Sequence, residues 1–117
     1  MSVSVRAATP SEYPTVESIL NAAMLAFDTG AVRRGSTLVA VEKRRVLGAL
    51  VLDGNRIEAV AVRPGRRGQG VGSALVRDAT SRRPKLVARF DADVYPFYDS
   101  LGFEIDCDGE RCRGVNR

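Results

Sequence analysis

A basic, glycine-rich segment at residues 63–72 lies between an alternating apolar run and a helical pattern, and it restricts how the chain can fold. Its glycines permit a tight backbone path that a ligand can approach without interference from Cβ atoms: Gly65, Gly68, Gly70 and Gly72. Because the segment leads into a helix, its amides can donate to an anion, and a phosphate or pyrophosphate is the expected ligand. The alternative is a solvated, arginine-rich turn.

Two common phosphate-binding motifs do not fit this segment. A Walker loop counted from Gly65 needs lysine at position 71, where the sequence has Val71. A dinucleotide fingerprint that starts at Gly68 needs a third glycine at position 73, where Ser73 stands. The aspartates at 91 and 93 lie near the spacing of a ribose-binding acid, so the dinucleotide interpretation is weakened and stays open.

The rest of the chain alternates strand-like and helix-like segments. Strand patterns cover residues 3–7, 37–41, 46–52, 56–62, 85–90 and 103–107, and helical patterns cover 10–27, 71–81 and 96–100. Thr9 as N-cap, Pro10 at the first helical position and Glu12 reaching back form a helix start. We expect a loop at 28–36 and a closing hairpin with its turn at 108–109. This order predicts an α/β (α+β) fold, a mixed sheet with flanking helices.

Length and composition exclude several classes of protein. The 117 residues suffice for a single domain, 1–117, and not for two. The absence of histidine excludes a Ser-His-Asp triad, a Cys-His dyad and a His-ligated metal site, and no metal is expected. A two-residue turn at 108–109 puts Cys107 and Cys112 out of register, so we expect reduced thiols. A four-residue loop would instead bring them face to face.

Charge and hydropathy limit the expected partners. The net charge is +4, from 18 basic and 14 acidic side chains, and the acidic residues are spread along the chain. Nucleic-acid binding is disfavoured, because only Phe90 lies near a basic strand and no stacking platform is visible. The first residues form no apolar run of signal-peptide or membrane-spanning length. We therefore expect a soluble, cytoplasmic protein without membrane contact.

Two motifs resemble those of the Gcn5-related N-acetyltransferase (GNAT) family. One is Arg/Gln-x-x-Gly-x-Gly/Ala after a strand ending Val-x-Pro, formed here by Val62, Pro64, Arg67, Gly70 and Gly72. The other is an aromatic-Tyr-x-x-x-Gly-Phe run, formed here by Phe97, Tyr98, Gly102 and Phe103. Both occur in the family's order and separation, on a matching order of elements. The chain resembles a minimal-length member, which implies a GNAT-like fold.

The resemblance implies where a cofactor binds. In this family two neighbouring parallel strands, here 56–62 and 85–90, splay apart and hold the pantetheine arm of acetyl-CoA between them. One strand would pair with the pantetheine amides, and the loop amides would hold the pyrophosphate. The cofactor-binding residues implied in this way are Val60, Ala61, Val62, Arg67, Gly68, Gln69, Gly70, Val71, Gly72 and Ser73.

The family often has asparagine seven residues before the motif tyrosine, and this chain has Asp91 there. A carboxylate accepts hydrogen bonds but cannot donate one, so a contact that needs the amide NH₂ would be lost. Asp91 is retained as a cofactor-binding candidate. Alternatively it faces a cationic acceptor together with Asp93, or both acids are solvated.

The resemblance also implies catalytic roles. Tyr98 would be the general acid that protonates the departing thiolate; the alternative is an ordinary core tyrosine. Glu58 is the only carboxylate in strand 56–62, on a face expected to include Arg56, Val60 and Val62, and it is the candidate base, acting through water. The alternative is a solvent-facing residue paired with a nearby arginine. Backbone N–H groups near Val60 would stabilise the oxyanion.

The sequence thus predicts an N-acetyltransferase that moves an acetyl group directly from acetyl-CoA, its cosubstrate, to a primary amine of a small molecule or protein. Neither cysteine lies in a cofactor motif, which argues against a covalent acyl-enzyme. A non-catalytic acyl-CoA-binding regulatory module of the same fold is the alternative. Acceptor specificity would come from residues 26–36 and 91–96. The acyl chain and the oligomeric state, including a homodimer, are open.

Overall fold

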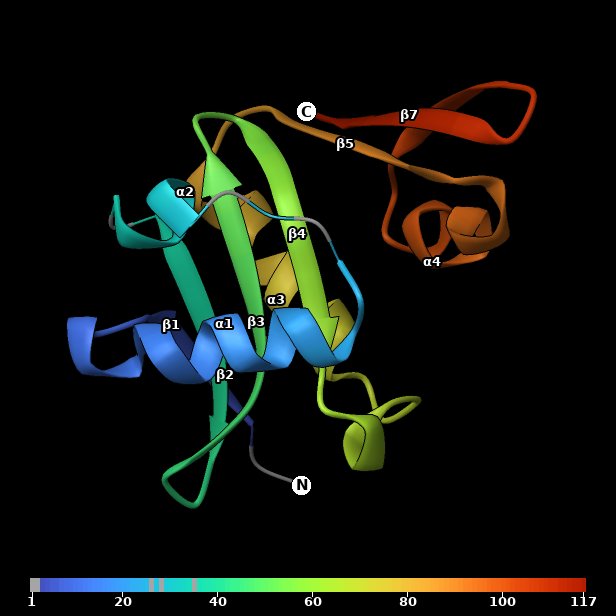
Figure 1. Ribbon diagram of the computed structural model, residues 1–117. Helices are drawn as coiled ribbons and strands as arrows, with labels where there is room; N and C mark the ends of the chain where they lie inside the picture. Colours follow the sequence, from blue (N-terminus) through green and yellow to red (C-terminus); the bar gives the residue numbers. More distant parts are fainter. Residues whose placement is uncertain (1–2, 26, 28, 35) are drawn as a thin grey trace.

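The computed structural model describes residues 3–25, 27, 29–34 and 36–117, which contain a seven-stranded mixed sheet (Figure 1). The strands lie in the order β1-β2-β3-β4-β5-β7-β6. Only β4 and β5 pair in parallel, and the other neighbours pair antiparallel. The predicted mixed sheet is confirmed. The strand bounds are β1 Ser4–Ala7, β2 Thr37–Glu42, β3 Arg45–Asp53, β4 Arg56–Val62, β5 Leu86–Asp91, β6 Glu104–Asp108 and β7 Arg111–Asn116.

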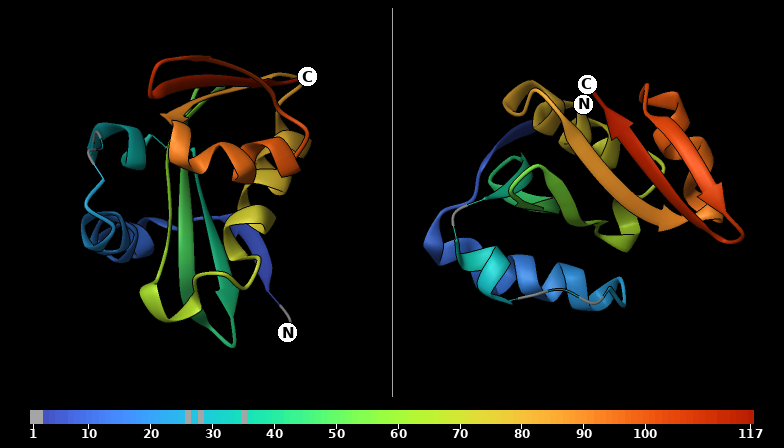
Figure 2. Two further views of the ribbon diagram at one scale, coloured as in Figure 1. Left: turned by 90° about the vertical axis from the view of Figure 1, so that its right-hand side faces the viewer. Right: turned by 90° about the horizontal axis from the view of Figure 1, so that it is seen from above.

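Helices cover both faces of the sheet (Figure 2). On one face lie α1 and α2, on the other lies α3, and α4 contacts β6. Their bounds are α1 Tyr13–Ala22, α2 Thr29–Arg33, α3 Val71–Arg82 and α4 Tyr95–Ser100, with short 3₁₀ turns at Pro10–Glu12, Pro64–Arg66 and Ala92–Val94. Among the described residues, no helix combines the length and the apolar character that a membrane span requires.

Helix α2 corrects the loop predicted for residues 28–36. Ala31 and Val32 are buried in the cluster beneath α1, and the Thr37 hydroxyl donates to the Val32 carbonyl oxygen at 3.0 Å. The sequence predicts a loop because residues 28–36 contain two glycines and a pair of arginines, and burial of the short segment overrides this local preference. Three residues of the expected loop and acceptor region lie outside the described residues: Ala26, Asp28 and Gly35.

Two apolar clusters attach the helices to the sheet. Helix α1 buries Val16, Ile19 and Leu20 against β3 and β4, as its spacing predicts. Helix α3 buries a stripe against the opposite face, formed by Val71, Leu75, Val76 and Ala79. The β3 backbone approaches its neighbours closely at Gly48, where an added Cβ would lie 2.8 Å from the Ala61 carbonyl oxygen. Only glycine fits this approach without a shift of the backbone.

Strand β4 bulges at Glu58 and separates from β5 next to it. On the β3 side the register skips Glu58, and on the β5 side only Arg56 and Ile57 have partners. The two parallel strands therefore diverge after Ile57, as the resemblance implies. The bulge also shifts the faces, because Ile57, Val60 and Val62 all pack in the cluster under α3. The common face predicted for Arg56, Glu58, Val60 and Val62 does not hold across it.

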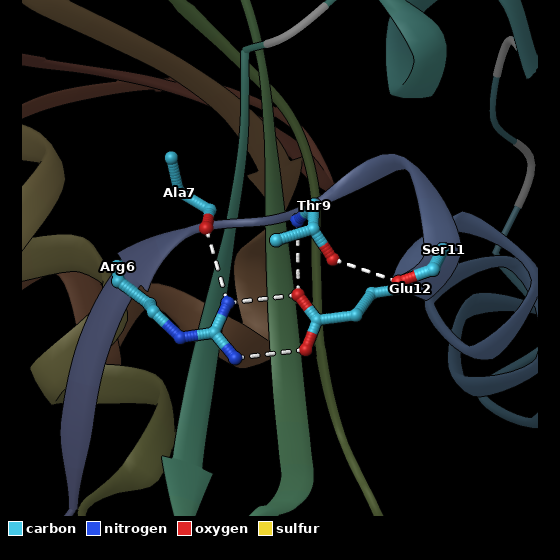
Figure 3. Close-up of polar contacts among 5 residues, drawn as sticks. All are labelled: Arg6, Ala7, Thr9, Ser11 and Glu12. Atoms are coloured by element: carbon cyan, nitrogen blue, oxygen red, sulfur yellow. Dashed lines mark hydrogen bonds and ion pairs between the residues drawn. The ribbon is translucent and has the colours of Figure 1, made fainter.

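Glu12 holds the start of the first helix, as predicted (Figure 3). Its Oε1 accepts a hydrogen bond from the Thr9 N–H at 2.9 Å, and its two oxygens accept from the Arg6 guanidinium at 2.8 Å each. The hydrogen bonds from Arg6 are the main reason that the pKa of Glu12 falls to about 2. This contact ties β1 to the entry of α1.

A disulfide joins Cys107 and Cys112 across the β6–β7 hairpin. The turn consists of residues 109 and 110 rather than 108 and 109, because Asp108 pairs with Arg111. Cys107 therefore lies directly opposite Cys112, with 4.0 Å between their Cα atoms. The predicted reduced thiols are wrong for this structure, since a turn displaced by one residue changes every cross-strand pair.

Candidate functional site

In the described part of the chain, two cavities lie where β4 leaves β5, and a third adjoins them on the far side of β5. The loop cavity, about 210 Å³, lies between the end of β4 and the start of α3. The cleft, about 500 Å³, lies between β4, β5 and α4. The sheet groove, about 420 Å³, lies on β5, β7 and β6. Phe97 borders the loop cavity and the cleft, while Arg89 and Arg111 border the cleft and the sheet groove.

The loop cavity gathers most of the residues predicted to bind pyrophosphate. Gly68 and Gly70 have φ of +74° and +85°, and Gly70 is the N-cap of α3. At both glycines an added Cβ would meet no atom within 4 Å. They are needed for the turn, and the space around them is open. The predicted residues that line this cavity are Val62, Arg67, Gly68, Gly70, Val71, Gly72 and Ser73.

The amides of this loop have the arrangement of an anion-binding site. Among the backbone hydrogen bonds of the described residues that lie outside helices and strands, none has a donor from 67–73. The first N–H groups of α3 also lack acceptors within the helix. Side chains brace the loop instead: Arg67 Nε donates to the Val62 carbonyl oxygen at 3.1 Å, and Arg66 Nε donates to Gln69 Oε1 at 2.8 Å. The loop is thus fixed while its amides stay available.

Tyr98, on α4, lines the cleft and also packs in the core. The residue is 5% exposed, and its ring stacks on Phe90 at a centroid distance of 4.4 Å, with edge contacts to Phe97 and Phe103. Burial raises the pKa of the Tyr98 hydroxyl to about 12, so the group is protonated at neutral pH. The two interpretations of Tyr98 are therefore compatible, because a core-packed ring borders the cleft.

Glu58, the bulge residue of β4, lines the same cleft as Tyr98. Its Oε2 lies 2.9 Å from Arg56 Nη2, and Arg56 also pairs with Asp53 at 3.4 Å. The Glu58 side chain is 23% exposed. A bulge re-aims the residue that it adds, which here brings a carboxylate to the wall of the cleft. To accept a proton, Glu58 would have to do so from within this ion pair.

Asp91 is the last residue of β5, Asp93 follows this strand, and both line the cleft. Asp91 Oδ1 accepts a hydrogen bond from Arg111 Nη1 at 2.6 Å, and the two residues are partners in the β5–β7 register. Asp91 does not border the loop cavity. Its position fits a contact in the cleft, and its role as a cofactor ligand stays a prediction.

The cavities and the predicted site differ at several residues. Ala61 and Gln69, both predicted to contact the cofactor, border none of the three cavities. Ala61 is buried in the cluster under α1, and the Gln69 side chain is held by Arg66. Several lining residues were not among the predicted site residues, including Leu25, Arg66, Arg89, Phe97 and Arg111. Phe97 is part of the motif that contains Tyr98, and this position could have identified it as a lining residue.

Solved structures share this fold. The apo form of YjaB from Escherichia coli is 24% identical, with a TM-score of 0.68 and a match that covers 98% of this chain and 96% of that chain. Naa50 from Arabidopsis thaliana, in complex with the bisubstrate analogue CoA-Ac-MVNAL, is 18% identical, with a TM-score of 0.78 and coverage of 98% and 97%. N-acetylglutamate synthase from Neisseria gonorrhoeae, complexed with coenzyme A and N-acetyl-glutamate, is 14% identical, with a TM-score of 0.82 and coverage of 100% and 35%.

Sequence comparison gives the family. No curated protein sequence matches the chain. The family model described as "Acetyltransferase (GNAT) domain" matches residues 33–105, which is more than half of the chain and includes both motifs. The resemblance drawn from those motifs is confirmed, and so is the GNAT-like fold. The chain belongs to the GNAT acetyltransferase family.

Proposed function

We propose that this chain is an N-acetyltransferase that moves an acetyl group from acetyl-CoA directly to a primary amine. The observation that carries this proposal concerns the backbone N–H groups of residues 67–73. Among the backbone hydrogen bonds that the described residues form outside helices and strands, none has one of these N–H groups as its donor. They surround a cavity that adjoins two diverging parallel strands. A diphosphate suits such a site, because it can accept several N–H groups at a helix N-terminus. The proposal takes residues 1–117 as one domain.

The splayed strands supply a place for the rest of the cofactor. Beyond Ile57 the edge of β4 that faces β5 has no partner strand in the described structure, so an extended pantetheine arm can pair with it as an added strand. The proposed contacts are Val60, Ala61 and Val62. This course leads from the loop cavity into the cleft, past Phe97, which borders both. The complex of Naa50 with a CoA-containing bisubstrate analogue supports the assignment.

The reaction requires a base, an oxyanion site and an acid. The amine nitrogen attacks the thioester carbon, the C–S bond breaks, and the sulfur leaves as a thiolate that takes up a proton. Backbone N–H groups near Val60 would stabilise the oxyanion, and Glu58 would receive the proton of the amine through water. Tyr98 would protonate the thiolate. Burial raises the pKa of the Tyr98 hydroxyl to about 12, so this group holds its proton at neutral pH.

Thiol release from acetyl-CoA across a panel of primary amines tests the role of Tyr98. Tyr98→Phe keeps the ring against Phe90 and removes only the hydroxyl, so we expect kcat to fall about 100-fold or more. Calorimetry should give a Kd for acetyl-CoA within about twofold of the wild type, a change of less than about 0.5 kcal/mol. Tyr13→Phe is the matched control, a buried tyrosine outside the three cavities. Unchanged kcat in Tyr98→Phe would remove this residue from the mechanism.

A non-catalytic acyl-CoA-binding module is the second candidate. It is favoured by two ion pairs, because Glu58 is held by Arg56 and Asp91 by Arg111. Calorimetry and thiol release separate the two candidates. Acetyl-CoA binding with thiol release above the uncatalysed rate supports the enzyme, whereas binding without release for any amine supports the module.

The acceptor in this proposal is a primary amine on a small molecule or a protein. It would bind in the cleft, whose lining includes Leu25 and Asp93, two residues that do not border the loop cavity. A cytoplasmic location stays a prediction from the sequence. This prediction can be tested by quenching cells with acid and measuring what fraction of the Cys107–Cys112 pair is oxidised. A mostly reduced pair would support a cytoplasmic location, because cytosolic thiols are kept reduced.

A further inference from the structure

The sheet groove contains two like charges that lie directly opposite each other. Arg89 of β5 and Arg113 of β7 are partners in the antiparallel register, and both border the groove. Side chains of such partners start about 5 Å apart, and like charges at this spacing destabilise a sheet. In the part of the chain that the structure describes, neither guanidinium forms a hydrogen bond or an ion pair. The fold therefore places positive charge here without compensating it.

The neighbouring residues show that acidic partners for these two arginines lie close by in the sheet. The next row on the same face holds opposite charges, Asp91 and Arg111, which form an ion pair at 2.6 Å. Asp106 lies opposite Arg113 on its other side, yet no ion pair joins them among the described residues. Helix α1 crosses β3 and β4 and leaves the β5–β7 face uncovered (Figure 1). The arginine pair is thus open to a ligand.

The location of the pair relates it to the cleft. Arg89 borders both the cleft and the sheet groove, whereas the glycine-rich loop meets the cleft at Phe97. When acetyl-CoA fills the loop cavity and enters the cleft from that end, the groove lies on the side left to the acceptor. This step rests on the proposed function.

We propose that Arg89 and Arg113 form an anion subsite for the acceptor, which is then an amine that also carries a carboxylate. The groove is lined by three guanidiniums and two aspartates, and the Arg111 guanidinium is already paired with Asp91, so Arg89 and Arg113 are the two guanidiniums left for a ligand. A carboxylate brings a single negative charge near Asp106 and Asp108, whereas a phosphate dianion would bring two. Guanidinium groups bind carboxylates through paired N–H donors, so two of them can fix both oxygens.

The test uses acetylated product analogues, so it does not depend on turnover. Protein labelled with ¹⁵N and saturated with coenzyme A is titrated with N-acetylated ω-amino acids of one to four methylenes, each compared with its carboxamide. We expect the Nε–Hε signals of Arg89 and Arg113 to shift with an acid, which binds about tenfold more tightly than its amide. The preference should vanish in the Arg89→Gln/Arg113→Gln double variant and persist in Arg77→Gln, an exposed arginine on α3.

Each other result overturns the subsite. Equal or absent binding of acids and amides, shifts that spare both arginines, or a preference that survives in the double variant would each do so. Calorimetry with acetyl-CoA on the same protein without added coenzyme A separates this failure from that of the proposed function. Loss of acetyl-CoA binding refutes the enzyme, whereas normal acetyl-CoA binding without a carboxylate preference refutes only the anion subsite.

Discussion

Replacing Gly70 with aspartate places a negative charge at the N-terminus of α3. The backbone there has φ of +85°, and an added Cβ would meet no atom within 4 Å, so the side chain enters open space. A left-handed backbone costs a non-glycine residue about 1–2 kcal/mol, and less for aspartate. This cost lowers stability and leaves the protein folded, so that a binding defect can be measured.

The size of the defect follows from Coulomb's law. Two unit charges about 5 Å apart repel by about 1 kcal/mol in water and by about 3 kcal/mol at the effective dielectric constant of a protein surface. A diphosphate with two charges at the loop amides would therefore bind Gly70→Asp about 2–6 kcal/mol more weakly. The expected rise in Kd is at least about 30-fold.

Calorimetric titration with acetyl-CoA measures this rise, and two variants control it. Gly70→Ala has at least the backbone strain of Gly70→Asp without its charge, and it should bind acetyl-CoA about tenfold more tightly than Gly70→Asp. Gly109→Asp adds the same charge at another glycine with positive φ and open space, in the β6–β7 turn, and should bind normally. The reasoning is refuted if folded Gly70→Asp binds acetyl-CoA like the wild type.

Two further variants and reduction of the disulfide test the fold. Glu12→Gln removes the ion pair with Arg6. The pKa of the Glu12 carboxyl is about 2 in the folded protein, below its ordinary value of 4.5. The ion pair therefore stabilises the fold above pH 4.5, and this contribution fades as the pH falls towards 2. Urea unfolding should show a loss of about 1–2 kcal/mol at pH 7, after allowance for solvent exposure, and an equal loss at pH 2 would contradict this. The disulfide closes a short loop and should contribute about 2 kcal/mol. Thiol titration of the unreduced, unfolded chain should find no free cysteine, and reduction should lower Tm; two titratable thiols would show an open pair. Gly48→Ala puts a Cβ 2.8 Å from a β4 carbonyl oxygen and should lower the free energy of unfolding by about 1–3 kcal/mol, so a wild-type Tm would refute the close approach.

The order of elements could be predicted from the sequence because most segments carry an unambiguous period. The alternating run that became β4 and the stripe of Val71, Leu75 and Ala79 in α3 are such segments. Helix α2 could not, since a five-residue helix shows no repeat and is stabilised by burial of Ala31 and Val32. The bulge at Glu58 depends on pairing with β3 and leaves no mark in a single sequence.

Some features of the candidate site could likewise be predicted from the sequence, and others could not. The loop cavity could be predicted, because glycines and a helix start adjoin in the sequence itself. The contacts of Asp91 could not, since its partner Arg111 is 20 residues away and its position depends on the register of the last hairpin. The disulfide was missed for the same reason, as one residue in the placement of the turn decides whether Cys107 faces Cys112.

The amide resonances of residues 67–73, followed by ¹H–¹⁵N spectroscopy while coenzyme A is added, test the central claim most directly. If these N–H groups bind the diphosphate, they should show the largest shifts in the spectrum and become slower in hydrogen exchange, and dephospho-coenzyme A should reproduce the effect. The claim is contradicted if these amides stay in place at saturating coenzyme A while signals elsewhere move.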